Sequence, residues 1–229
     1  ALTAKYGAAG KKIHTGRSRN DQVIVATRLY ARAFLLAFME ASSQLVDHLL
    51  TFAEENQLVP MVGRTHMQIA MPSSVGLWAG AYAEQLLDDL ELVKTAYHLN
   101  NQSPLGSAAS YGVPLPLNRE LVAELLGFAK VQNNVLYANN RRGKMESIIL
   151  DAVDQVVLTL SKIAQDLILY SMPEFAYFSL PDNLCSGSSI MPQKKNPCGL
   201  ELLRAKSATV SSCAFQIKNI IKALPSGYN

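Results

Sequence analysis

Apolar residues recur along most of the chain at alternating steps of three and four, which places them on one face of an α-helix. Four such stripes are present, at residues 20–55, 79–97, 149–167 and 200–224. The alternation of single apolar and polar residues that is typical of β-strands is almost absent. The pattern therefore predicts an all-α protein built on four long helices.

The predicted helices are longer than a compact monomer of this size needs. The first would span roughly 50 Å at about 1.5 Å per residue. Near-heptad stripes on helices of that length pack as a bundle with small crossing angles. The stripes leave enough apolar surface that we expect a homo-oligomer. With no internal repeat and no low-complexity linker, residues 1–229 are predicted to form one helical-bundle domain.

Three polar, turn-rich segments separate the predicted helices. They are HTGRSRNDQ (14–22), GRTHMQIAMP (63–72) and GSSIMPQKKNP (187–197). A further loop, SPLGSAASYGVPLP, leads to a short helix near Asn118. Gly, Pro, Ser and Asn explain why the helices break there, but not why so many charged and hydroxyl groups gather in these segments.

Composition narrows the class of protein. Of the 229 residues, 49% are hydrophobic and 17% charged, and a formal net charge of +3 is too mild to indicate a nucleic-acid partner. Three cysteines without a CxxC pair favour a reducing, cytoplasmic setting, and we expect no membrane span. Without a GxGxxG, Walker-type or HExxH motif, neither nucleotide nor metal is implied. The chain starts without Met and stops after a Pro-Ser-Gly turn, which suggests the middle of a longer polypeptide.

The serine loop, residues 187–197, combines groups suited to anion chemistry. Asn196 is a good N-cap and Pro197 a good first helical residue, so the fourth helix is predicted to start there. Lys194, Lys195 and free N–H groups at a helix N-terminus would favour a carboxylate. The Ser188 hydroxyl could act as a base only where nearby positive charge stabilises its alkoxide. The residue types alone leave open an ordinary solvated surface loop.

His66 follows Gly63-Arg64-Thr65, and a lone histidine after a helix is more often structural. A carboxylate that orients its ring would suit it to acid–base work. Glu201, one turn into the fourth helix, is the candidate, although sequence alone does not show that the two meet.

The segment HTGRSRND carries two arginines and His14 ahead of the first long helix. Arginine holds carboxylates through two parallel hydrogen bonds, and Asn20 could donate a further one. The alternative is a hydrated helix entry capped by Asn20 or Ser18, which leaves the two arginines and His14 unexplained.

Together these segments resemble the fumarase–aspartase superfamily of lyases, and within it the argininosuccinate lyase family, which includes the lens δ-crystallins. GSSIMPQKKNP is similar to the superfamily's signature loop GSSxMPxKxNP. QKKN is the form of argininosuccinate lyases, whereas fumarases show GKVN and adenylosuccinate lyases HKRN. HTGRSRNDQ and GRTHMQ are also close to argininosuccinate lyase forms. The resemblance covers residues 11–229 and implies the central helical domain of the fold, without the family's N-terminal region and C-terminal domain.

The resemblance implies a carbon–nitrogen lyase of arginine biosynthesis that cleaves argininosuccinate to arginine and fumarate by β-elimination, without metal or organic cofactor. It implies that Ser188 removes the Cβ proton and that Lys194 stabilises the resulting aci-carboxylate. His66, paired with Glu201, would act near the leaving nitrogen. The positions that match substrate-binding residues are Arg19, Asn20, Thr65, Gln68 and Tyr228. The implied assembly is a homotetramer in which three subunits build each active site.

Two departures from the family pattern stand out. The run Ser-Asp-Arg-Asp that usually precedes the third long helix reads Asn-Asn-Arg-Arg here, at 139–142, so that Asn140 and Arg142 replace acidic residues. Cys198 stands where an aspartate is usual. Two alternatives therefore stay open: a superfamily lyase for a different succinyl substrate, and a non-catalytic structural protein like the δ-crystallins. The intact Ser188, Lys194 and His66 favour an enzyme.

Overall fold

The computed structural model describes residues 1–227 and divides into two compact units. Unit 1 comprises residues 1–37, 94–149 and the chain from 217 onward, and unit 2 comprises residues 38–93 and 150–216. All four of the long helices begin in one unit and end in the other. The predicted single domain over 1–229 stays a prediction.

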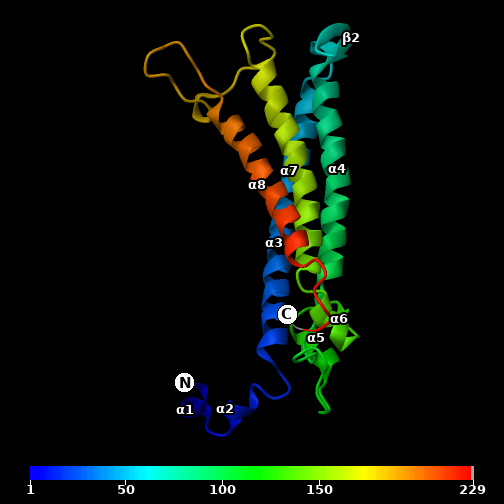
Figure 1. Cartoon of the computed structure of the whole chain (residues 1–229). Coiled ribbons are helices and arrows are strands. Elements are labelled where there is room, and N and C mark those ends of the chain that lie inside the picture. The colour runs from blue at the N-terminus through cyan, green and yellow to red at the C-terminus, as the bar shows by residue number, and fades with distance from the viewer. Residues whose placement is uncertain (228–229) are drawn as a thin grey trace. The chain divides into compact units, whose positions relative to one another are not determined.

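The four long helices are present, and the chain is mainly helical as predicted (Figure 1). They are α3 (Arg19–Glu55), α4 (Val75–Asn100), α7 (Lys144–Tyr170) and α8 (Cys198–Ile220). The last ends before its stripe does, because Ala223 adopts a φ of 59° that no α-helix accommodates. Ile221 and Leu224 therefore lie in a turn rather than on the helix.

Shorter elements lie in unit 1. They are α1 (Leu2–Tyr6), α2 (Ala9–Lys12), β3 (Gln102–Ser103), α5 (Arg119–Leu125), β4 (Lys130–Val131) and α6 (Val135–Asn140). The predicted short helix is α5, and Asn118 caps it by accepting a hydrogen bond of 2.9 Å from the Leu121 N–H. β3 and β4 pair in parallel. A 3₁₀ helix, η1 (Asp182–Leu184), lies in unit 2.

One element was missed by sequence reasoning. The segment expected to be a turn-rich connection is an antiparallel hairpin of β1 (Pro60–Thr65) and β2 (Gln68–Ser74). Its two-residue loop, His66 and Met67, has φ values of 51° and 63°. A type I′ turn requires positive φ at both positions and is usually signalled by Asn-Gly or Asp-Gly, so His-Met gave no such signal.

A buried arginine organises unit 1. The Arg28 guanidinium donates to the Gln102 carbonyl at 2.6 Å and to the Gln132 side chain at 2.5 Å. Burial is the main cause, and the nearby positive charge of Arg141 the second, that lowers the pKa of Arg28 to about 10. The guanidinium is therefore still charged at neutral pH. These bonds join α3 to the segments that carry β3 and β4.

Residues of α4 and α7 contribute to the buried core of unit 2. Ala79, Ala83 and Leu86 of α4 and Ala152, Val156 and Ala164 of α7 are all buried. One buried polar pair lies among them, in which the Thr159 hydroxyl donates to the Asp89 carboxylate at 2.6 Å. Burying a carboxylate costs free energy unless hydrogen bonds replace its lost water.

One helix of the described residues, α3, is long and apolar enough to cross a bilayer by length and composition, with a mean hydropathy of 1.4 over its most apolar window. Helices that pack against other helices in a protein core pass the same test. This single helix is therefore only a weak indication of a membrane span.

Replacing Thr159 with Val should destabilise unit 2, because it leaves the buried Asp89 carboxylate without its donor while keeping the side-chain shape. We expect the free energy of unfolding to fall by about 1–3 kcal/mol, measured by urea unfolding. Ser161→Ala is the matched control, since the exposed Ser161 hydroxyl bonds only the carbonyl of Leu158 on its own helix. Equal losses in the two variants would contradict the role of the Asp89–Thr159 pair.

Candidate active site

The serine loop is closed at its base by a short antiparallel bridge. Ser186 and Asn196 exchange backbone hydrogen bonds of 2.9 and 2.8 Å, and the Asn196 side chain donates to the Gly187 carbonyl at 3.3 Å. The prediction that Asn196 caps the fourth helix is wrong, because the helix begins one residue later than predicted and the Asn196 Oδ1 accepts no hydrogen bond among the described residues. The helix α8 begins at Cys198, after Pro197, whose carbonyl accepts from the Glu201 N–H at 3.1 Å.

Ser188 is half-buried inside this loop. Its Oγ accepts hydrogen bonds from the backbone N–H groups of Ile190, at 3.4 Å, and Met191, at 3.2 Å. Hydrogen bonds donated to an oxygen favour its charged form. The loop backbone therefore stabilises negative charge on this oxygen, as a base needs and as the sequence did not reveal.

The two adjacent lysines have different surroundings. The Lys195 ammonium forms an exposed ion pair with Asp182 of η1. The hydrogen bond from Lys195 lowers the pKa of the Asp182 carboxyl, and the same bond raises the pKa of Lys195. Among residues 1–227, the Lys194 ammonium has no hydrogen-bond or ion-pair partner. Lys194 is thus the cation of the pair that is available to a ligand.

The hairpin gathers three of the predicted site residues. Thr65 and Gln68 form its last pair, and His66 lies between them at the tip, exposed and with positive φ. A non-glycine residue in this region costs free energy, and such residues cluster at functional sites. The hairpin thus presents the His66 imidazole on a short, fixed turn.

An aromatic cluster underlies this end of unit 2. It consists of Trp78, Tyr82, Tyr170, Phe175, Tyr177 and Phe178. Trp78 and Tyr82 of α4 both donate to the Asp166 carboxylate of α7, at 2.9 and 2.7 Å. Burial raises the pKa of the Tyr82 hydroxyl well above its usual value, and the hydrogen bond to Asp166 is the second largest cause of this rise.

The hairpin is attached to this cluster through Arg64. Its guanidinium lies 4.7 Å from the centre of the Phe175 ring and donates to the Met67 carbonyl at 3.2 Å. A cation over an aromatic face is attracted by the ring's quadrupole. One side chain therefore links the hairpin tip to the segment between α7 and the serine loop.

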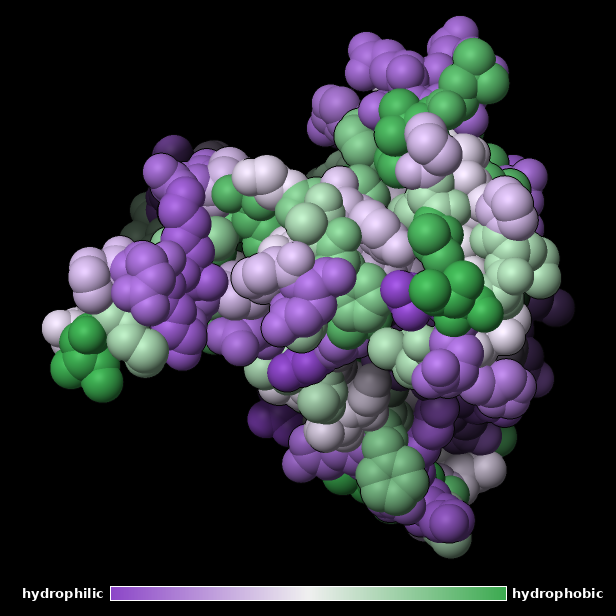
Figure 2. Space-filling model, turned by 90° about the horizontal axis from the view of Figure 1, so that it is seen from above, coloured by the Kyte–Doolittle hydropathy of each residue, from purple (hydrophilic) through white to green (hydrophobic). Residues whose placement is uncertain are grey.

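The serine loop and the hairpin lie at the same end of unit 2 but on separate sides of it (Figure 1). Seen from above, the loop projects at the left and is covered mostly by hydrophilic residues (Figure 2). Among the described residues, His66, Ser188 and Glu201 make no hydrogen bond with one another. The pairing of His66 with Glu201 is not formed within this chain and stays a prediction.

The other predicted substrate-binding residues lie elsewhere. Arg19 and Asn20 begin α3 in unit 1. Of the two proposed caps, Ser18 is the one that acts, since its Oγ accepts from the Asn20 N–H at 3.2 Å while the Asp21 carboxylate accepts from the Ser18 N–H at 3.0 Å. Tyr228 lies outside the described residues.

Within residues 1–227, no group of three or more His, Cys, Asp or Glu side chains could hold a metal ion. Sequence reasoning missed the residues that hold other side chains of the candidate site in place. Asp182 is thirteen residues from its partner Lys195, in a segment without periodicity. Only the position of Asp182 in an otherwise weakly charged stretch could have drawn attention to it.

Comparison with known proteins identifies the family. The model of a protein family described as "Lyase" matches residues 1–212. The chain belongs to this lyase family. The resemblance stated from three motifs is thereby confirmed over most of the chain.

Three relatives show how far the likeness extends. The chain is 48% identical over 227 residues to an argininosuccinate lyase of Parabacteroides distasonis, covering 99% of this chain and 51% of that one. An EDDS lyase in complex with formate matches with a TM-score of 0.95 and 29% identity, covering 99% of this chain and 46% of the other. A variant of EDDS lyase with bound fumarate matches with a TM-score of 0.93 and 29% identity, covering 97% of this chain and 45% of the other. This chain thus spans about half the length of the curated relatives that it matches.

The turn at the hairpin tip gives a test of the geometry around His66. Met67→Gly should stabilise the hairpin by about 1 kcal/mol, since glycine adopts positive φ without the steric cost of a side chain. Met67→Val should weaken it, because a β-branched residue is disfavoured there. Hydrogen exchange of the Thr65 and Gln68 amides measures both. Faster exchange in the glycine variant would contradict the type I′ turn.

Proposed function

We propose that the natural protein containing this chain cleaves argininosuccinate to arginine and fumarate. The observation that carries the proposal is the serine loop, where Ser188 Oγ accepts hydrogen bonds from two backbone N–H groups. Lys194 follows in the same loop, and its ammonium has no hydrogen-bond or ion-pair partner within residues 1–227. The likeness to an argininosuccinate lyase at 48% identity supports the choice of substrate.

The proposed reaction is a β-elimination. The Ser188 alkoxide takes a proton from the Cβ of the succinyl group, and the C–H electrons pass toward the neighbouring carboxylate, where negative charge develops. Lys194 stabilises that charge, which is a contribution realised mainly in the transition state. The charge then collapses to form the C=C bond of fumarate while the C–N bond breaks. His66 is proposed to serve the proton balance at the leaving nitrogen.

The proposed assembly is a homotetramer whose active sites each combine residues of three copies. Two features of the chain support it. The serine loop and the hairpin tip are separated within unit 2, so that a complete site requires residues from another copy. The long helix α3 also exposes large apolar side chains that a second copy would cover, namely Val23, Tyr30, Phe34, Leu36, Leu50 and Phe52.

The setting is proposed to be the cytoplasm. The three cysteines are free thiols in the described structure, as suits a reducing compartment. No cofactor or metal is part of the proposed chemistry, since a hydroxyl base and an ammonium group suffice for the elimination.

A second candidate is elimination from a different succinyl compound. It is favoured by the close likeness to EDDS lyase, with a TM-score of 0.95, and by the Asn140 and Arg142 departures. A non-catalytic role like that of the δ-crystallins has less support, because Ser188, Lys194 and His66 are all retained.

The test is to incubate the full natural protein with argininosuccinate, and in parallel with EDDS, and to quantify fumarate together with arginine. Ser188→Ala should lower kcat by roughly 10²–10⁴-fold, the usual contribution of a positioned acid or base. Its helical circular dichroism should not change.

Ser189→Ala is the matched control, because the exposed Ser189 hydroxyl makes no hydrogen bond among the described residues. We expect the Ser189→Ala variant to keep kcat within about tenfold of the wild type, a much smaller loss than the one expected for Ser188→Ala. A Ser189 variant as inactive as Ser188→Ala would contradict the assignment of the base. Fumarate release from EDDS alone would favour the second candidate, and release from neither compound would favour the structural role.

A further inference from the structure

Arg64 is the residue through which the hairpin contacts the aromatic cluster. It lies in β1, two residues before His66 at the tip. The register of the two strands shifts between Gly63 and Arg64, which marks a β-bulge at this point. A bulge bends the strand and redirects the side chains next to it. Arg64 is thus placed at the irregular step of the hairpin.

The Arg64 guanidinium lies against two rings of the cluster. Its carbon atom is 4.7 Å from the centre of the Phe175 ring. Burial raises the pKa of Tyr170 on α7, and the nearby charge of Arg64 opposes that rise. Among residues 1–227, the buried Arg64 Nε has no hydrogen-bond partner. A buried donor without a partner costs free energy, so the attraction between the cation and the ring has to offset that cost.

The same guanidinium also closes the hairpin tip. It donates to the Met67 carbonyl at 3.2 Å. Donor and acceptor therefore lie on either side of His66 along the chain. Both tip residues have positive φ, 51° at His66 and 63° at Met67, which costs free energy for residues that carry a side chain. The bond from Arg64 thus helps to hold His66 in a conformation that side chains disfavour.

We propose that Arg64 is a positioning residue of the reaction, which fixes the His66 imidazole relative to the aromatic cluster. The inference rests on the proposed function, in which His66 serves the proton balance at the leaving nitrogen. Proton transfer requires the two heavy atoms to be within hydrogen-bond reach, and a displacement of about 1 Å can lower the rate by roughly 10²-fold. Arg64 need not touch the substrate for its loss to slow the reaction.

Two substitutions separate the parts of this contact. Arg64→Met keeps a long apolar stem but removes both the charge and the donor to the Met67 carbonyl. Phe175→Leu removes the ring and keeps apolar volume, while the hydrogen bond from Arg64 to Met67 remains possible. The first variant therefore removes both restraints on the tip, and the second removes only the attraction to the ring.

The first measurement is hydrogen exchange of the Thr65 and Gln68 amides, which belong to the last pair of the hairpin. Arg64→Met should exchange about tenfold faster than the wild type, as expected for the loss of one cation–π contact and one hydrogen bond. Phe175→Leu should show a smaller increase. Unchanged exchange in Arg64→Met would overturn the proposed role, whatever the protein's activity.

The second measurement is steady-state kinetics of the full natural protein with argininosuccinate. Arg64→Met should lower kcat by roughly 10- to 100-fold, with KM little changed, because the loss concerns proton transfer rather than substrate binding. In the His66→Asn background, Arg64→Met should cause no further loss, since a residue that acts through His66 then has nothing left to position. Equal losses of kcat in the two backgrounds would contradict the proposal.

Arg32→Met is the matched control. The Arg32 guanidinium lies 5.0 Å from the centre of the Phe128 ring and donates to the carbonyls of Leu126 and Gly127, at 2.8 and 2.6 Å. It makes the same kind of contact in unit 1. We expect Arg32→Met to lower stability in urea unfolding while kcat stays near the wild-type value. A loss of kcat as large as that in Arg64→Met would reduce Arg64 to a structural residue.

The two proposals fail in different ways. Turnover by the wild type with an unchanged kcat in Arg64→Met would overturn the positioning role and leave the proposed function intact. No turnover of argininosuccinate by the wild type would overturn the proposed function and, with it, the reaction assigned to His66. Hydrogen exchange at the tip would still decide in that case whether Arg64 holds the turn.

Discussion

The two hydrogen bonds that Asp166 accepts, from Trp78 and Tyr82, are the contacts on which the candidate site most depends. They join α4 to α7 where α4 leaves the hairpin and α7 enters the segment that leads to the serine loop. The aromatic cluster extends this contact outward, with Phe178 5.0 Å from Trp78 and Phe175 under Arg64. The half-buried Asp166 carboxylate, with its two aromatic donors, thus fixes the base of both segments of the candidate site.

Sequence periodicity predicted the helices because a stripe of apolar residues at steps of three and four buries only as a helix. The hairpin escaped prediction for a local reason. Its turn requires two residues with positive φ, and tertiary contacts such as Arg64 on Phe175 stabilise His66 and Met67 there in place of the usual Asn-Gly. A hydrogen-bonded turn supported by distant residues leaves no mark in the local pattern.

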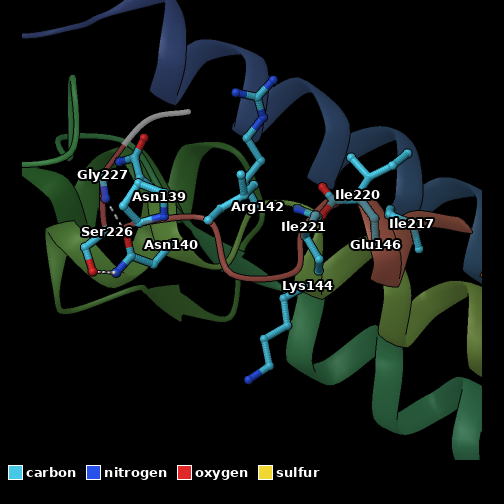
Figure 3. Close-up of a pocket in the computed structure, with 13 residues that line it drawn as sticks. Asn139, Asn140, Arg142, Lys144, Glu146, Ile217, Ile220, Ile221, Ser226 and Gly227 are labelled. Atoms are coloured by element: carbon cyan, nitrogen blue, oxygen red, sulfur yellow. Dashed lines mark hydrogen bonds between the residues drawn. The ribbon is translucent and has the colours of Figure 1, made fainter.

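The candidate site was likewise predictable from the sequence only in part. Motif resemblance named Ser188, Lys194 and His66, since the chemistry of those side chains depends on residue type. It could not name their supports, which are the two N–H groups at Ser188 Oγ, the Asp182 partner of Lys195 and the Asn196 side chain at the loop base. The structure also shows what surrounds two of the residues that depart from the family pattern. Asn140 binds the turn after α8 (Figure 3), and Cys198 begins α8 with its Sγ 2.7 Å from the Ser186 Oγ.

The central claim is that no single copy of the chain completes the proposed site, because His66 and Ser188 are on separate segments of unit 2. Mixing equal amounts of Ser188→Ala and His66→Asn variants of the full natural protein, under conditions that exchange subunits, tests it most directly; asparagine tolerates the positive φ at residue 66. If the base and the histidine come from different subunits, random mixing restores about one quarter of the wild-type activity. If both come from one chain, every chain carries a lesion, and fully exchanged tetramers without activity would contradict the account.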